Sequence, residues 1–199
     1  MHDEVAAAND IGDMGANGPE VDSARASLAM RKDLLEFQHA IGAPGRCPFP
    51  VIVALHGAVV GLGVDLISAC DIRYAASDAS FTIKVSTLAR NAQRSVSFLQ
   101  EVDIGLAPDI GTLAYLPKIT GNDSLVRELT FTGRTFSAVE AEKLGLVSKV
   151  VDGSRDEVVK AALDLAKVIA SKSPVAILSS KHLLTHSRDH TCVFVGHDI

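Results

Sequence analysis

The chain has 199 residues, of which 47% are hydrophobic and 22% are charged, so residues 1–199 suffice for one α/β domain, or a large piece of one, with a buried core. A formal net charge of −5, with lysines and arginines scattered along the chain, argues against a nucleic-acid-binding surface. The most apolar run, residues 50–64, is too short to span a bilayer, so we expect no membrane partner.

The first elements follow from turn residues and periodicity. The Gly, Asn and Asp residues of "NDIGDMGANGPE" predict a loop, and apolar residues at helical spacing predict a helix over residues 21–41. "GAPGRCPFP" ends this helix, and the β-branched run "VIVALHG" then predicts a buried strand. Glycines lead directly into "VDLISACD", which predicts a strand-turn-helix unit, and "IRYAAS" and "SFTIKV" predict two further short strands.

The second half is mainly helical by the same criteria. Helices are predicted near residues 111–116 and 124–130, and Ser137 with Glu140 forms a capping box at the start of another. An amphipathic pattern predicts a helix over residues 156–171, and the proline of "SPVAIL" begins a last one. Strands that alternate with helices favour an α/β fold.

The cysteines and the N-terminus bear on the compartment. Cys47, Cys70 and Cys192 are widely spaced and lack the paired spacing of zinc or redox motifs, which indicates free thiols in a reducing compartment and no metal site. "MHDEVAAAND" resembles neither a signal peptide nor a transit peptide, so no targeting signal is expected in this chain.

Two acids, Asp65 and Asp71, lie in the segment that follows the glycines. We interpret Asp71 as structural, either capping a helix or pairing with Arg73. Asp65 follows a turn, formed by Gly61 and Gly63, whose backbone N–H groups are free to face an anion. This pattern is weak by itself, because many glycine-rich turns have no other role, and Asp65 could equally cap a helix.

Two more acids occur downstream in an apolar setting. Glu101 and Asp109 stand in "EVDIGLAPDIGTLAYLPKITG", ahead of another helix that begins after a glycine. On local grounds alone they could be a solvated loop acid and a helix N-cap.

Longer motifs resemble the enoyl-CoA hydratase/isomerase (crotonase) family. They are "PVIVALHGAVVGLGVDLISACDIRYAA", "EVDIGLAPDIGTLAYLPKITGN", "LTFTGRTFSAVEAEKLGLVSKVV" and "SKSPVAILSSKHLL", which together cover about residues 50–184. The resemblance implies a crotonase-like α/β fold, a spiral of ββα units. The acids at Asp65, Glu101 and Asp109 are similar to the three-acid pattern of the Δ3,5-Δ2,4-dienoyl-CoA isomerases, whereas enoyl-CoA hydratases usually carry a glycine-rich stretch near Asp109.

The resemblance implies an isomerase that converts 3,5-dienoyl-CoA to 2,4-dienoyl-CoA in fatty-acid β-oxidation. Glu101 would be the base at C2, Asp109 the acid at C6, and Asp65 would orient or tune the pair. One carboxylate cannot reach both carbons, which explains the need for several acids. Burial in an apolar acyl pocket would raise their pKa values and let them exchange protons near neutral pH.

The same resemblance implies how the substrate is held. The backbone N–H of Leu62, between Gly61 and Gly63, would stabilise the dienolate oxygen, with leucine standing where the family commonly has glycine. The coenzyme A thioester is the substrate, so neither a cofactor nor a metal is implied. The family further implies a homotrimer or hexamer in the peroxisome or mitochondrion.

The chain departs from the family pattern in three places. Residues 85–100 form an atypical insert between "SFTIK" and "EVDIGL", which we interpret as retained intron sequence, an aberrant gene model or a surface loop. The sequence starts after the family's "SxGxD"-like loop, which supplies the second oxyanion N–H. It ends in "TCVFVGHDI", where the family has subunit-interface helices. We therefore expect a crotonase-like fragment, incomplete at both ends, whose trimer formation is impaired.

Other functions remain open on the sequence alone. The chain could be an enoyl-CoA hydratase, a Δ3,Δ2-enoyl-CoA isomerase, or an inert truncated homologue that only associates with other subunits. If residues 85–100 loop outward, Asp65, Glu101 and Asp109 should converge near the Leu62 N–H.

Overall fold

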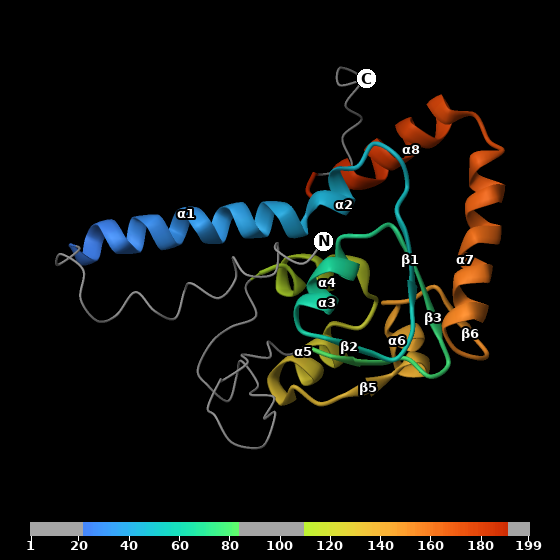
Figure 1. Ribbon diagram of the computed structural model, residues 1–199, viewed down its shortest axis with the longest axis horizontal. Helices are drawn as coiled ribbons and strands as arrows, with labels where there is room; N and C mark the ends of the chain where they lie inside the picture. Colours follow the sequence, from blue (N-terminus) through green and yellow to red (C-terminus); the bar gives the residue numbers. More distant parts are fainter. Residues whose placement is uncertain (1–21, 84–109, 191–199) are drawn as a thin grey trace, which may run out of the picture. The chain divides into compact units, whose positions relative to one another are not determined.

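The computed structural model describes residues 22–83 and 110–190 (Figure 1). The helices in these ranges are α1 (Ser23–Ile41), α2 (Ala43–Arg46), α3 (Leu62–Ser68), α4 (Thr112–Ile119), α5 (Asp123–Thr132), α6 (Ala138–Leu144), α7 (Arg155–Ala170) and α8 (Pro174–His186). The strands are β1 (Ile52–Leu55), β2 (Ala58–Val60), β3 (Ile72–Ala76), β4 (Ser80–Thr82), β5 (Phe136–Ser137) and β6 (Lys149–Val151). None of these helices combines the length and apolarity needed to cross a membrane.

The chain divides into two compact units. The first ends at Phe37 and contains most of α1, and the second begins at Gln38 and contains all the other elements. The prediction of one domain over residues 1–199 stays a prediction, and the 85–100 insert lies outside the described residues.

In the second unit, the first four strands alternate between two sheets. One sheet has the order β1-β3-β6 and is parallel throughout, and the other has the order β2-β4-β5. In the second sheet β4 pairs with β2 in parallel and with β5 antiparallel. The chain passes from β1 to β2 through Gly57 at φ 62°, and then enters α3. The next two strands, β3 and β4, again pass from the first sheet to the second, as expected of the ββα spiral that the resemblance predicts.

The hydrophobic core joins both sheets to the helices. Phe81 of β4 and Phe136 of β5 stack with ring centroids 5.5 Å apart, and Leu116, Leu129 and Leu144 from three helices are fully buried in the same cluster. Helix α7 packs along β1 and β3 (Figure 1). The apolar run of β1 is therefore covered by a helix that follows it by about 100 residues, a separation typical of non-local α/β packing.

Most predicted elements are present, and the omissions are short. The helix predicted over residues 21–41 is α1, and Ser137 accepts from the Glu140 N–H at 3.2 Å in the predicted capping box. The run "VIVALHGAVV" was predicted to contain one strand but contains two, because glycine turns the chain between β1 and β2. Three further elements, each of four residues or fewer, were not predicted from the sequence: α2, β5 and β6.

The cysteines agree with the prediction of free thiols where the structure describes them. Cys47 is half-buried and Cys70 is buried, and both are unpaired. Burial raises the pKa of the Cys70 thiol, so this group is protonated and unreactive at neutral pH. Cys192 lies outside the described residues.

Candidate functional site

The turn before α3 has a backbone conformation that favours glycine. Gly61 precedes the first residue of α3 with φ 53° and ψ −114°, and its N–H donates to the Thr82 carbonyl at 3.0 Å. A side chain is strained at such angles. Leu62 begins the helix, so its N–H has no earlier carbonyl within the helix to which it could donate. The predicted role of the Leu62 N–H as an oxyanion donor stays a prediction.

Substituting this glycine tests the turn. We expect Gly61→Ala to lower the free energy of unfolding by about 1–3 kcal/mol, because alanine rarely adopts the positive φ found here. The matched control is Gly121→Ala, where an added Cβ meets no atom within 4 Å and φ is not in the strained range. Urea unfolding of the two variants measures the difference, and equal stability would show that the turn at Gly61 tolerates a side chain.

Asp65 lies in the first turn of α3 and is 3% exposed. Its Oδ1 accepts two hydrogen bonds from Thr112, one from the backbone N–H and one from Oγ1, both at 2.5 Å. Thr112 is the first residue of α4, so the carboxylate satisfies an N–H that the helix itself leaves unpaired. A Cβ on Gly111 would stand 3.4 Å from the Asp65 Cβ, which shows how closely the two helices approach.

These contacts assign Asp65 a capping role, which was the structural alternative considered for it. These two hydrogen bonds do not by themselves give Asp65 a catalytic role, but they place its buried carboxylate at the N-terminus of α4. The role of Thr112 could not be predicted from the sequence, because a threonine at the start of a helix is common and its partner is 47 positions away.

Removing the hydroxyl of Thr112 should weaken this junction. We expect Thr112→Val to cost about 1.5–3 kcal/mol of unfolding free energy, because the side chain keeps its volume but one bond to a buried charged group is lost. Thr130→Val is the control: Thr130 is also buried, but its hydroxyl donates to the Val126 carbonyl of its own helix. The free energy of unfolding is measured by urea denaturation. An equal loss in both variants would show that the hydrogen bond from Thr112 to Asp65 stabilises the fold no more than the bond within α5.

Glu101 and Asp109 lie outside the described residues. Their predicted convergence with Asp65 therefore stays a prediction. Asp109 precedes Thr112 by three positions in the sequence. Asp65 thus binds the first residue of α4, which follows Asp109 by three positions in the sequence.

The predicted pairing of Asp71 with Arg73 is wrong. Asp71 Oδ2 instead accepts from Lys181 Nζ at 2.7 Å and from the Val51 N–H at 2.8 Å. Lys181 belongs to α8, so the partner lies 110 positions away, where no local spacing rule could find it.

Arg73 uses its guanidinium in another way. It donates to the main-chain carbonyls of Leu146 and Cys70, and at 3.5 Å to that of Ile67. Burial lowers its pKa from the ordinary arginine value, yet the group remains charged at neutral pH. Arg73 therefore joins the end of α3 to the segment before β6 rather than neutralising Asp71.

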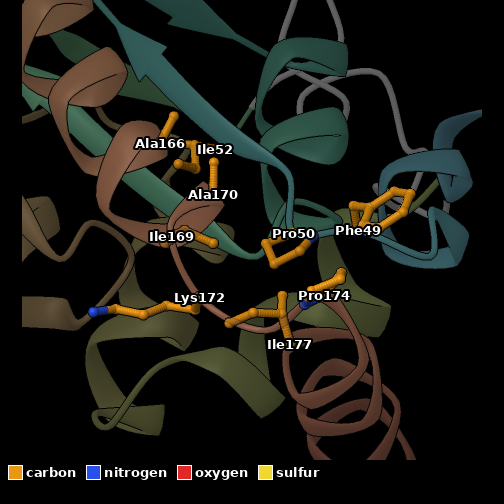
Figure 2. A pocket seen from close by; sticks show the side chains of 9 residues that line it. All are labelled: Phe49, Pro50, Ile52, Ala166, Ile169, Ala170, Lys172, Pro174 and Ile177. Carbon is orange, nitrogen blue, oxygen red and sulfur yellow. The ribbon is translucent and has the colours of Figure 1, made fainter.

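An apolar cavity of about 400 Å³ opens elsewhere in the second unit (Figure 2). Its lining comes from the start of β1 and from α7, α8 and the turn between them. The residues are Phe49, Pro50, Ile52, Ala166, Ile169, Ala170, Lys172, Pro174 and Ile177. None of them belongs to α3 or α4, so this cavity is separate from the surroundings of Asp65.

Known proteins are similar to this chain in sequence and in fold. Residues 5–193 match the family described as Enoyl-CoA hydratase/isomerase. The chain is 48% identical over 170 residues to the human (Homo sapiens) "Delta(3,5)-Delta(2,4)-dienoyl-CoA isomerase, mitochondrial", which covers 85% of this chain and 47% of the human protein. It is 43% identical over 168 residues to the corresponding peroxisomal protein of Arabidopsis thaliana, which covers 84% of this chain and 54% of that protein.

A solved structure agrees with the predicted fold. The crystal structure of a probable enoyl-CoA hydratase/isomerase from Mycobacterium abscessus superposes with a TM-score of 0.68 at 28% identity, over 84% of this chain and 58% of that one. The chain spans about half the length of the curated relatives it matches. The crotonase-like α/β prediction is confirmed, and the chain belongs to the enoyl-CoA hydratase/isomerase family.

Proposed function

We propose that this chain forms part of an enzyme that isomerises 3,5-dienoyl-CoA to 2,4-dienoyl-CoA, with Asp65, Glu101 and Asp109 as its acids. The observation that carries the proposal is the similarity, over 85% of the chain, to a relative named as this isomerase. The buried carboxylate of Asp65, at the junction of α3 and α4, supports it.

The proposed reaction moves one proton and leaves the formula of the substrate unchanged. Glu101 takes a proton from C2, next to the thioester, and the electron pair of the C–H bond moves into the carbonyl to give a dienolate. Asp109 then delivers a proton to C6, which leaves double bonds at C2 and C4. Glu101 is now protonated and Asp109 ionised, and transfer of a proton between them restores the starting state.

The described residues have two tasks in this mechanism. The N–H of Leu62 donates to the dienolate oxygen, because Gly61 turns the chain so that this N–H starts a helix. Asp65 is a positioning residue: it holds Thr112 and with it the end of the segment that carries Asp109. Both tasks depend on rigid placement, since a displacement of about 1 Å can cost a hundredfold in rate.

The remaining features of the proposal follow from the relatives. The coenzyme A thioester is the substrate, and no cofactor takes part in the proposed proton transfers. The mitochondrion or the peroxisome is the proposed compartment, because relatives in both carry this name. A homotrimer or hexamer is the proposed assembly.

Product analysis tests the function. The protein is incubated separately with 3,5-dienoyl-CoA and with 2-enoyl-CoA, and the products are identified by chromatography and mass. We expect 2,4-dienoyl-CoA from the first substrate, with unchanged mass, and no addition of water to the second. A product heavier by one water would instead identify a hydratase. No turnover of either, together with stable binding to an added full-length dienoyl-CoA isomerase, would favour an inert associating homologue.

A further inference from the structure

Strand β1 forms an edge of the parallel sheet. It pairs with β3 on one side, and on its other side the described part of the chain places no strand. The Ile72 N–H donates to the Val51 carbonyl, and backbone groups alternate sides along a strand, so the N–H and C=O groups of Ile52 and Ala54 point away from β3. Among residues 22–83 and 110–190, these groups have no backbone partner.

This edge lacks the features that usually prevent a strand from pairing further. Its residues read "IVAL", without a charged side chain or a proline, and the register with β3 is continuous, without a bulge. An apolar edge of this kind is a template for another strand. The backbone of β1 can therefore accept one more strand beside it.

Helix α7 lies over this edge rather than over the middle of the sheet. It packs against β1 more than against β3, and least against β6 (Figure 1). One side of α7 carries an apolar stripe at helical spacing, formed by Val159, Leu163, Ala166 and Ala170. Ala166 and Ala170 line the cavity together with Ile52 of the edge strand (Figure 2). The stripe therefore faces the space beside β1.

We propose that the space beside β1 and beneath α7 binds one extended peptide strand. The strand pairs with the free backbone groups of Ile52 and Ala54 and inserts an apolar side chain into the cavity. At about 400 Å³ the cavity is within the size range of ligand pockets, about 300–1,000 Å³. An extended segment satisfies the backbone groups of β1 and covers the apolar side of α7 at the same time.

A second copy of this chain does not fit the same space. Two β1 strands paired across a two-fold axis perpendicular to the sheet would lie about 4.8 Å apart, whereas packed helices need about 8–10 Å between their axes. Because α7 lies over β1, the α7 helices of the two copies would overlap on the same face. The occupant is therefore a strand that carries no helix on that face.

Lys172 indicates the charge of the peptide. Its aliphatic carbons line the cavity, and its ammonium group points outward (Figure 2). In the described part of the chain no acid pairs with this ammonium group. A peptide with apolar residues at alternate positions and an acidic residue at its end is therefore complementary to the site.

Calorimetric titration of the full chain with a synthetic peptide tests the proposal. The probe alternates valine and threonine over about six residues, and a glutamate flanks each end. We expect one bound peptide per chain. Ala54→Pro should weaken binding at least about tenfold, because proline removes a donor on the free side of β1 and leaves the pairing with β3 in place. Far-UV circular dichroism checks that the variant keeps its fold.

Two exposed apolar residues of α7 give a matched pair of variants. Leu163 and Val168 are each 56% exposed, and they lie five positions apart, on different sides of the helix. Leu163→Ser should weaken peptide binding about fivefold or more, because the peptide covers this side chain. Val168→Ser should change the affinity less than about twofold. Equal effects of the two substitutions would overturn the proposal.

The charge of the peptide is tested in the same way. The native protein should prefer the glutamate-flanked peptide to a lysine-flanked one by about two- to threefold, because the interaction is at the surface. Lys172→Met should remove this preference. A preference that is unchanged in Lys172→Met would contradict the assignment of Lys172 to the site.

Methylation of the peptide nitrogens tests the backbone pairing without altering the protein. Methyl groups on one alternate set of nitrogens should abolish binding, and those on the other set should change the affinity less than about threefold, because only one set faces β1. Equal effects of the two sets, or no binding of the unmodified peptide, would overturn the proposal. A dimer in ultracentrifugation that Ala54→Pro dissociates would also overturn it, because a second copy would then occupy the edge. None of these readouts depends on isomerase activity.

Discussion

Glu101→Gln is expected to lower the rate of 3,5-dienoyl-CoA isomerisation by about 10²- to 10⁴-fold, because the amide cannot accept the C2 proton. Asp109→Asn should have an effect of the same size, since it removes the donor at C6. The measurement is kcat/KM from the appearance of 2,4-dienoyl-CoA, at several pH values. Loss of kcat with little change in KM would indicate that the acids act on the reacting carbons rather than in binding.

The matched control for these variants is Asp156→Asn. Asp156 is an acid in the first turn of α7 whose side chain is 90% exposed, so its neutralisation should leave turnover unchanged. Full activity in either Glu101→Gln or Asp109→Asn would remove that residue from the mechanism. A loss in Asp156→Asn as large as in the other two would show that overall charge, rather than placed acids, controls the rate.

Lys181→Met is expected to be the most destabilising single change among the described side chains, at about 3–5 kcal/mol of unfolding free energy. Lys181 is 7% exposed, and its Nζ donates to the carbonyls of Pro44 and Phe49 at 3.0 Å as well as to Asp71. Methionine keeps the volume but leaves the Asp71 carboxylate without its ion pair and two carbonyls without a donor.

The comparison variants separate charge from packing. Lys172→Met removes an exposed lysine at the rim of the apolar cavity and should change stability by less than about 0.5 kcal/mol. Asp71→Asn in the Lys181→Met background should cost much less than in the native protein, because the two groups interact directly. Additive losses in that double-mutant cycle, from urea denaturation, would contradict a coupled pair.

Local signals explain which parts of the fold could be predicted. The capping box of Ser137 and Glu140 spans three positions, so it is readable from the sequence and is present in the structure. The contacts of Asp65 and Asp71 span 47 and 110 positions, so their partners depend on how the sheets assemble. The resemblance to a family indicated that Asp65 is a site residue. Neither composition nor spacing could show that Thr112 is its hydrogen-bond partner.

Short elements are a second part of the fold that the sequence could not predict. Strand β2 is only three residues long and continues an apolar run, so period and composition cannot separate it from β1. β2 is a separate strand because the chain changes from one sheet to the other at Gly57, and this change depends on the tertiary structure. The helices α7 and α8 are long enough for their periodicity and their first residues to define them.

The packing of α7 on β1 has a consequence during synthesis. Strand β1 leaves the ribosome well before α7, and at about 5–20 residues per second the roughly 100 intervening residues take about 5–20 s to be translated. For that interval the apolar face of β1 has no helix to cover it, and parallel strands cannot gain their full pairing locally. We expect the nascent chain to bind hydrophobic-segment chaperones at residues 50–64 until α7 has been made.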